Sequence, residues 1–94
     1  MTITVKEAKE LTCAAMLARA TETAEKSTLT LEKIEEEIKE AASAGLQENH
    51  IGLRSYMMNS EFPDMEMAKN FIASTVRRQG FTVKWEDYIL IVKW

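Results

Sequence analysis

The alternation of apolar and polar side chains in the C-terminal segment Gly80–Trp94 constrains the fold of this chain more than any other feature. The segment is GFTVKWEDYILIVKW, and a period of two residues is typical of a β-strand with one buried face. The alternation is interrupted at Glu86 and Asp87, which predicts a β-hairpin with its turn there. The expected pairs are Trp85 with Tyr88, Val83 with Leu90, and Phe81 with Val92. Their register stays open by one residue, because Glu-Asp is not a favoured two-residue turn.

The two faces of this hairpin differ in a way that predicts how the sheet is covered. The paired side chains share one face with Trp94, and this face suits a hydrophobic core. The opposite face carries Thr82, Lys84, Ile89, Ile91 and Lys93. Two neighbouring isoleucines are unexpected on a face that should meet water. They predict that either the long N-terminal helix or another protein chain covers this face.

A helical pattern occupies the N-terminal half of the chain. Thr4 and Glu7 match a capping box, and Gly45 is typical of the residue that ends a helix. Two apolar stripes lie between them: Val5, Ala8, Leu11, Ala15 and Ala18, then Leu31, Ile34, Ile38, Ala41 and Leu46. The threonine-rich stretch that separates the stripes predicts either a break near residues 27–30 or one helix of roughly 40 residues. The alanine-rich first stripe contributes little transfer energy, so we expect residues 1–30 to be a helical arm. Such an arm packs on the rest of the domain or, as we favour, on a second copy.

The middle of the chain predicts a short strand over Asn49–Tyr56, a loop, and a second helix that begins near Pro63 and ends at Gly80. The expected fold is therefore α+β, with the order α–β–α–β–β. A small, three-stranded, mainly antiparallel sheet carries its helices on one face, and a long N-terminal helix or arm precedes it. We expect a single domain of residues 1–94, with the arm in residues 1–30 and the α+β core in residues 31–94.

Composition restricts the class of protein. The single cysteine excludes an internal disulfide, and the net charge of -3 with a pI of about 5.2 argues against general nucleic-acid binding. The first residues lack the basic and apolar regions of a signal peptide, and no apolar run approaches the roughly 18 residues of a membrane span. These features predict a soluble, cytoplasmic protein with no membrane partner.

No motif for catalysis or cofactor binding rises above background. His50 is the only histidine, and Cys13 lies far from it in sequence, so neither a zinc site nor a thiol nucleophile is expected. We expect Cys13 to be a small buried hydrophobic side chain among alanines. Glu35, Glu36 and Glu37 are consecutive in a helix and diverge around its axis, so they do not form an acid/base pair. The sequence therefore predicts no enzyme, no cofactor and no bound metal.

Two sets of residues are candidates for binding. The ligand set is His50, Arg54, Tyr56, Arg77 and Arg78. In an extended strand the first three share one face, arginines bind phosphate oxygens, and tyrosine stacks on a base. The contact set is Met57, Met58, Ile89 and Ile91. Its methionines belong either to an adaptable binding surface or to the core over the sheet edge.

The glycine and apolar positions of residues 34–94 resemble a pattern seen in small bacteriophage accessory or early proteins, most of unknown function. The resemblance rests on the helix ending AASAG, the short strand, the second helix and the final GFTVKWEDYILIVKW. It implies an α+β fold and origin in a phage that infects a host cell. Some small phage proteins of this size inhibit host defence, either by binding a protein or by sequestering a nucleotide signal. No functional residue is carried over from this resemblance.

Three interpretations of function follow. The leading one is a non-enzymatic, homo-oligomeric protein that binds and inhibits a host protein through the methionine-rich segment, the Ile89/Ile91 face or the acidic helix. The second is an oligomeric protein that sequesters a nucleotide or another anionic signal molecule with the ligand set. The third is a structural or assembly factor built on the N-terminal helix.

Overall fold

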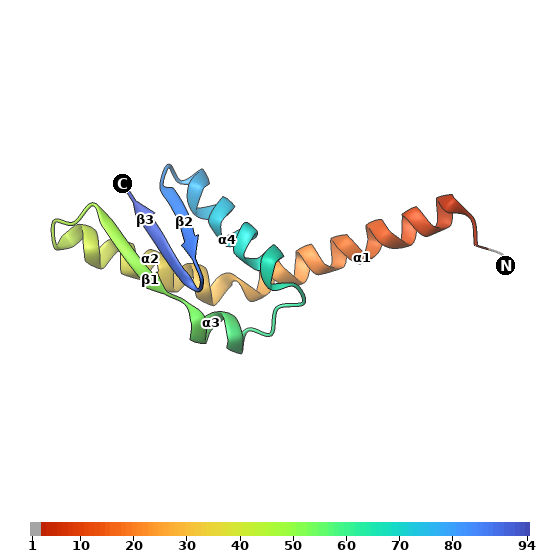
Figure 1. The fold of residues 1–94 in the computed structure, drawn as a ribbon, viewed down its shortest axis with the longest axis horizontal. Helices are drawn as coiled ribbons and strands as arrows, with labels where there is room; N and C mark the ends of the chain where they lie inside the picture. Colours follow the sequence, from red (N-terminus) through yellow and green to blue (C-terminus); the bar gives the residue numbers. More distant parts are fainter. Residues whose placement is uncertain (1–2) are drawn as a thin grey trace.

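A computed structural model describes residues 3–94, and it contains both helices and a β-sheet (Figure 1). In chain order the elements are α1 (Val5–Lys26), α2 (Thr28–Ser43), β1 (Glu48–Gly52), α3 (Arg54–Asn59), α4 (Met65–Arg78), β2 (Thr82–Glu86) and β3 (Ile89–Lys93). Most of helix α1 extends away from the other elements, and we call the remainder of the chain, from Thr23 onward, the body. The predicted α+β class is confirmed.

The three strands form one antiparallel sheet in the order β1–β3–β2, so the C-terminal strand is central. The hairpin is present, but its register lies two residues away from the expected one, since Trp85 faces Leu90 instead of Tyr88. The turn is formed by Asp87 and Tyr88, and Asp87 has a φ of 56°. Aspartate enters this left-handed region more readily than most residues, which places the turn there. A shift of two residues leaves each side chain on its predicted face.

The hydrophobic core lies between one face of the sheet and the helices α2 and α4. Ile34 of α2, Ile72 of α4 and Leu90 of β3 are each buried within it. The prediction that the helices pack on one face is confirmed. The other face is not covered by α1, because Ile89 remains exposed there and α1 contacts α4 and α2 instead. The prediction that the long N-terminal helix covers this face is therefore wrong, and coverage by another protein chain stays a prediction.

The N-terminal helical region is two helices that meet at Ser27. The Ser27 hydroxyl donates a hydrogen bond of 2.6 Å to the carbonyl oxygen of Thr23, one turn earlier. Such a bond back to the preceding turn competes with the helical pattern and bends helices. Thr23, Ser27 and Thr30 are all buried, so the body begins at Thr23 and the predicted arm of residues 1–30 is too long.

The predicted strand over Asn49–Tyr56 is wrong in its second half. Strand β1 ends at Gly52, and α3 begins at Arg54. Leu53 and Met57 are both fully buried, a spacing of four residues that a helix places on one face. The backbone N–H of Leu53 donates to the carbonyl of Tyr88 over 2.9 Å, which holds the start of α3 against the hairpin turn. These tertiary contacts select the helix.

Every described residue from Ile3 to Glu22 is exposed, and we call this segment the arm. It accounts for the elongated shape of the described chain, whose extents are 63 × 26 × 20 Å (Figure 1). The arm therefore packs on no other part of the described chain. Of the two partners predicted for the packing of the arm, the body of the same chain is therefore excluded.

The buried Thr30 gives a test of the packing at the α1–α2 junction. Its hydroxyl has no hydrogen-bond partner within residues 3–94, and an orphaned buried polar group costs about 1–3 kcal/mol. Thr30→Val keeps the shape and removes the hydroxyl, so we expect it to raise the free energy of unfolding by about 1 kcal/mol. Urea unfolding followed by circular dichroism measures this change. The exposed Thr28→Val is the matched control and should change stability by less than about 0.5 kcal/mol; a Thr30→Val variant less stable than this control contradicts the packing.

Candidate functional site

The residues of the ligand set do not form one site. His50 lies on β1, whereas Arg54 and Tyr56 lie on α3, so the strand face that was to align them does not exist. Arg77 and Arg78 lie in the last turn of α4. The set is therefore spread over three elements.

Two contacts show how far apart the arginines of this set are. The guanidinium of Arg54 lies over the Tyr88 ring, 5.6 Å from its centroid, at the hairpin turn. A guanidinium nitrogen of Arg77 donates to the carbonyl of Val83 over 3.0 Å, toward the other end of the hairpin. Val83 pairs with Val92, which is four residues from Tyr88, and strand residues rise about 3.3 Å each, so Val83 and Tyr88 are separated by about 13 Å along the sheet. One phosphate group does not bridge that distance.

The hairpin turn instead carries a cluster of cations and aromatic rings that sequence patterns did not indicate. The ammonium of Lys69 lies 4.6 Å from the ring centroid of Tyr88 and 5.5 Å from that of Trp85. It also donates to the carbonyl of Asp87 over 2.7 Å. The indole N–H of Trp85 donates to the carbonyl of Lys69 over 2.9 Å. These contacts attach the turn to α4, so the cluster has a structural role.

The contact set divides into buried and accessible residues. Met57 is fully buried in the core, so a partner does not reach it, and its assignment as a contact residue is wrong. Its side chain is needed where α3 closes the end of the core. Met58, the next residue on α3, is exposed. Ile89 is 43% exposed, and Ile91 is half-buried beside it.

The accessible isoleucines lie at the centre of an uncovered sheet surface, which we call the open face. It consists of Glu48, His50 and Gly52 from β1, Ile89, Ile91 and Lys93 from β3, and Thr82, Lys84 and Glu86 from β2. Ile91 is flanked across the strands by His50 and Lys84, and Ile89 by Gly52 and Glu86. A Cβ at Gly52 would meet nothing within 4 Å, so the position beside Ile89 is open. The open face thus has an apolar centre and a charged rim.

Charges on the rim of the open face are partly paired. A ring nitrogen of His50 lies 2.7 Å from a carboxylate oxygen of Glu48. This hydrogen bond from His50, with the nearby Lys93 ammonium, holds the pKa of Glu48 below its ordinary value. Lys84 and Glu86 add one charge of each sign on β2. The rim therefore has no strong net charge that would select a highly charged ligand.

The acidic helix behaves as a solvated surface. Glu37 and Glu35 pair with Lys33 and Lys39 over 2.8 and 3.1 Å, each one turn apart on α2. The hydrogen bond from Lys33 holds the pKa of Glu37 below its ordinary value. Each carboxylate thus has its own lysine, and the two do not converge as an acid/base pair.

An apolar cleft between α2 and the end of α4 was not indicated by the sequence. Its volume is ≈ 620 Å³, and its apolar lining residues include Leu31, Ile38 and Phe81. Glu35, Lys39 and Gln79 lie among its lining residues. No histidine or cysteine is among its lining residues. A second cleft of ≈ 460 Å³ lies beside Tyr56 and Leu29.

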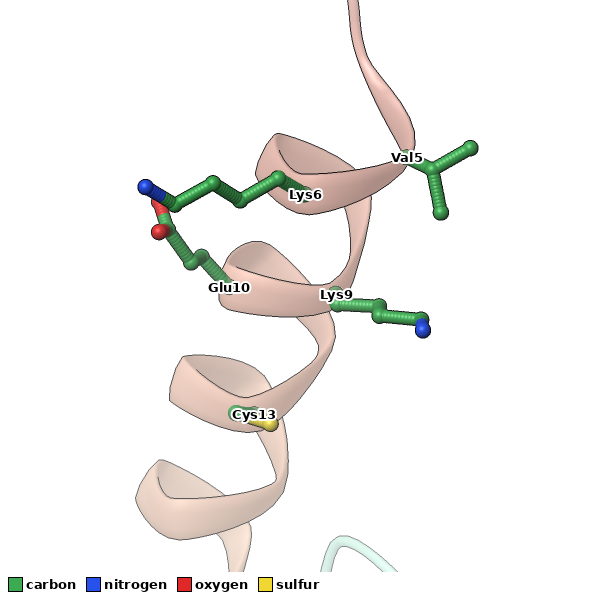
Figure 2. A pocket seen from close by; sticks show the side chains of 5 residues that line it. All are labelled: Val5, Lys6, Lys9, Glu10 and Cys13. Atoms are coloured by element: carbon green, nitrogen blue, oxygen red, sulfur yellow. The ribbon is translucent and has the colours of Figure 1, made fainter.

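A third hollow lies on the arm and includes the only cysteine of the chain. Figure 2 shows its lining residues Val5, Lys6, Lys9, Glu10 and Cys13, all from α1. No second element faces them, and Lys6 and Glu10 point toward one another while Val5 and Lys9 point away. The hollow is therefore an open helix surface. Cys13 is exposed there, which contradicts its predicted burial, because the arm contacts no other part of the described chain.

Comparisons with known proteins add no identification. No family model matches the chain, and neither curated proteins nor solved structures give a significant match. In the part of the chain from residue 3 onward, no helix is both long and apolar enough to cross a membrane. The same part contains no group of histidine, cysteine, aspartate or glutamate side chains that would hold a metal ion.

The cluster at the hairpin turn makes a prediction about Lys69. Lys69→Met keeps the aliphatic stem but removes the charge-assisted hydrogen bond to Asp87 and the attraction to two rings. We expect the free energy of unfolding to fall by about 1–2 kcal/mol. Urea unfolding measures the loss. In the control Lys39→Met, the broken ion pair is highly exposed and should cost less than about 0.5 kcal/mol; equal losses in the two variants would show that the cluster does not hold the turn.

Proposed function

We propose that this chain is a non-enzymatic protein-binding module and that the open face is its contact surface. The observation that carries the proposal is the exposed Ile89 beside the half-buried Ile91, on a sheet face that no helix of residues 3–94 covers. An apolar centre with a polar rim is the usual anatomy of a protein–protein interface. A rigid central strand presents both isoleucines, so little conformational order is lost when they are covered.

The chemistry of the open face favours a protein partner over a small anion. Its cations Lys84 and Lys93 face the same surface as Glu48 and Glu86, so a phosphate would meet both signs of charge. A protein surface with an apolar anchor and mixed charges at its edge complements this pattern. The resemblance to small phage proteins makes a host protein the first class of partner to test, with inhibition as the expected effect. The ligand set gives the alternative of nucleotide sequestration less support, because its residues are dispersed.

Ile89→Lys tests the contact surface. The new ammonium would lie beside Glu86, so we expect the fold to persist while the apolar anchor is lost. Affinity capture from a cell extract, followed by calorimetric titration of the purified partner, should show binding at least about tenfold weaker than for the unmodified chain. Leu46→Lys is the matched control, since Leu46 is exposed on the body but outside the open face.

Two results contradict the proposal. One is a partner that binds Ile89→Lys and Leu46→Lys with equal affinity. The other is a rise in melting temperature on adding a nucleotide, abolished by Arg54→Ala, because a ligand that binds only the folded state stabilises that state by RT ln(1 + [L]/Kd). The second result supports the sequestration alternative.

A further inference from the structure

The arm is an exposed helix whose middle carries no charge. Between Glu10 and Arg19 the sequence is LTCAAMLA, so apolar side chains surround the helix on all sides. Leu11 is 63% and Leu17 69% exposed. A helix that is apolar all round is normally buried, and a helix held only at one end is marginal in water. The arm therefore requires a partner outside its own chain.

We propose that this partner is the arm of a second copy, packed antiparallel to the first. The arm is close to symmetric in charge about its apolar middle. Lys6, Glu7, Lys9 and Glu10 precede the apolar segment, and Arg19 and Glu22 follow it within the arm. Positive and negative charges are thus equal in number at each end, so two arms meet without net repulsion in an interface that uses the same surface on both copies. A foreign partner would find no net charge to steer it.

The size of the body selects the antiparallel arrangement. Packed helices lie about 8–10 Å apart. Two parallel arms at that spacing would place both bodies at the same end. The chain is 26 × 20 Å across its two shorter axes, which is wider than the spacing of the helices, so the two bodies would collide. Antiparallel arms place the bodies at opposite ends, where they do not collide. Figure 1 shows the body at one end of α1, while the other end of the helix extends away from it.

The length of the arm sets the strength of the association. At 1.5 Å per residue, the exposed part of α1 is about 27 Å long. Two such helices side by side bury a strip near the area of about 1,000 Å² at which specific interfaces begin. Ile3 and Val5, at the tip, then approach the body of the second copy and extend this strip. Interfaces at this lower limit of size are typical of weak association, so we expect a dimer that forms at micromolar concentrations and dissociates on dilution.

The first experiment measures mass by analytical ultracentrifugation at about 100 µM, well above a micromolar Kd. We expect twice the mass of 10.7 kDa for the unmodified chain, and a monomer for Leu11→Asp and Leu17→Asp. Leu46→Asp is the matched control on the body and should remain dimeric. Leu11 and Leu17 are exposed and lie outside the core, so we expect both arm variants to keep the body folded, as the near-ultraviolet circular dichroism of its tryptophans checks.

The second experiment measures orientation with spin labels on single cysteines. Cys13 lies near the middle of the arm, so two labels there are at the same height whichever way the arms run. In a Cys13→Ser chain, Lys6→Cys and Thr21→Cys place the label near each end. Antiparallel arms predict a short distance at position 13 and axial offsets of about 22 Å at the other two. Parallel arms predict short distances at all three.

These results are separable from those on the open face. Ile89→Lys should leave the dimer intact, and Leu11→Asp should leave Ile89 exposed on a folded body. A monomer at about 100 µM, a dimer that survives both arm variants, or short distances at all three label positions would overturn the proposal. Loss of binding in Ile89→Lys alone bears only on the proposed function.

Discussion

The central strand β3 is the element on which the rest of the body depends. It pairs along its whole length with β1 on one side and β2 on the other, and its Leu90 and Val92 are fully buried. Helices α2 and α4 reach the core through the same face of the sheet. Because strand residues alternate, fixing Leu90 and Val92 toward these helices fixes Ile89 and Ile91 toward the open face. The core and the proposed contact surface are therefore two consequences of one alternation.

Two lysines donate hydrogen bonds to connecting segments of the body, at residues whose backbone has a positive φ that most residues avoid. Asp87 and Glu61 both have positive φ, at 56° and 51°. The carbonyl of Asp87 accepts from Lys69, and the carbonyl of Glu61 accepts from Lys26 over 2.8 Å. Such conformations persist only where surrounding contacts stabilise them. Each lysine comes from a helix remote in sequence, so the turn and the loop are fixed by the tertiary structure.

Two surfaces remain without a partner in the described chain, and they differ in character. The open face is small, rigid and rimmed by charge, as suits recognition of another protein surface. The arm is long and has no single dominant apolar face. Its helix is only marginally stable in isolation, which suits association with the arm of a second copy. In an antiparallel dimer the two bodies lie at opposite ends, so the two open faces are far apart. A partner that presents two copies of its own contact site would then bind both faces with increased avidity.

The sequence by itself determined the features that depend on neighbouring residues. The alternation of Gly80–Trp94 predicted the hairpin and both of its faces, and the apolar spacing from Met67 to Val76 predicted α4. Such periodicities state directly which side chains can share a face, so the α+β class and the isoleucines of the open face were foreseeable.

Only the tertiary structure decided features that depend on contacts between distant segments. The helix at Arg54–Asn59 forms because Leu53 and Met57 fit the core and Leu53 bonds to Tyr88, and no local pattern distinguishes this from a strand. The residues of the ligand set lie apart for the same reason, because their predicted alignment required a strand that continued to Tyr56. The exposure of Cys13 and of the whole arm also came from the structure. A sequence shows that an alanine-rich helix needs a neighbour, but where that neighbour can lie depends on how the body closes without it.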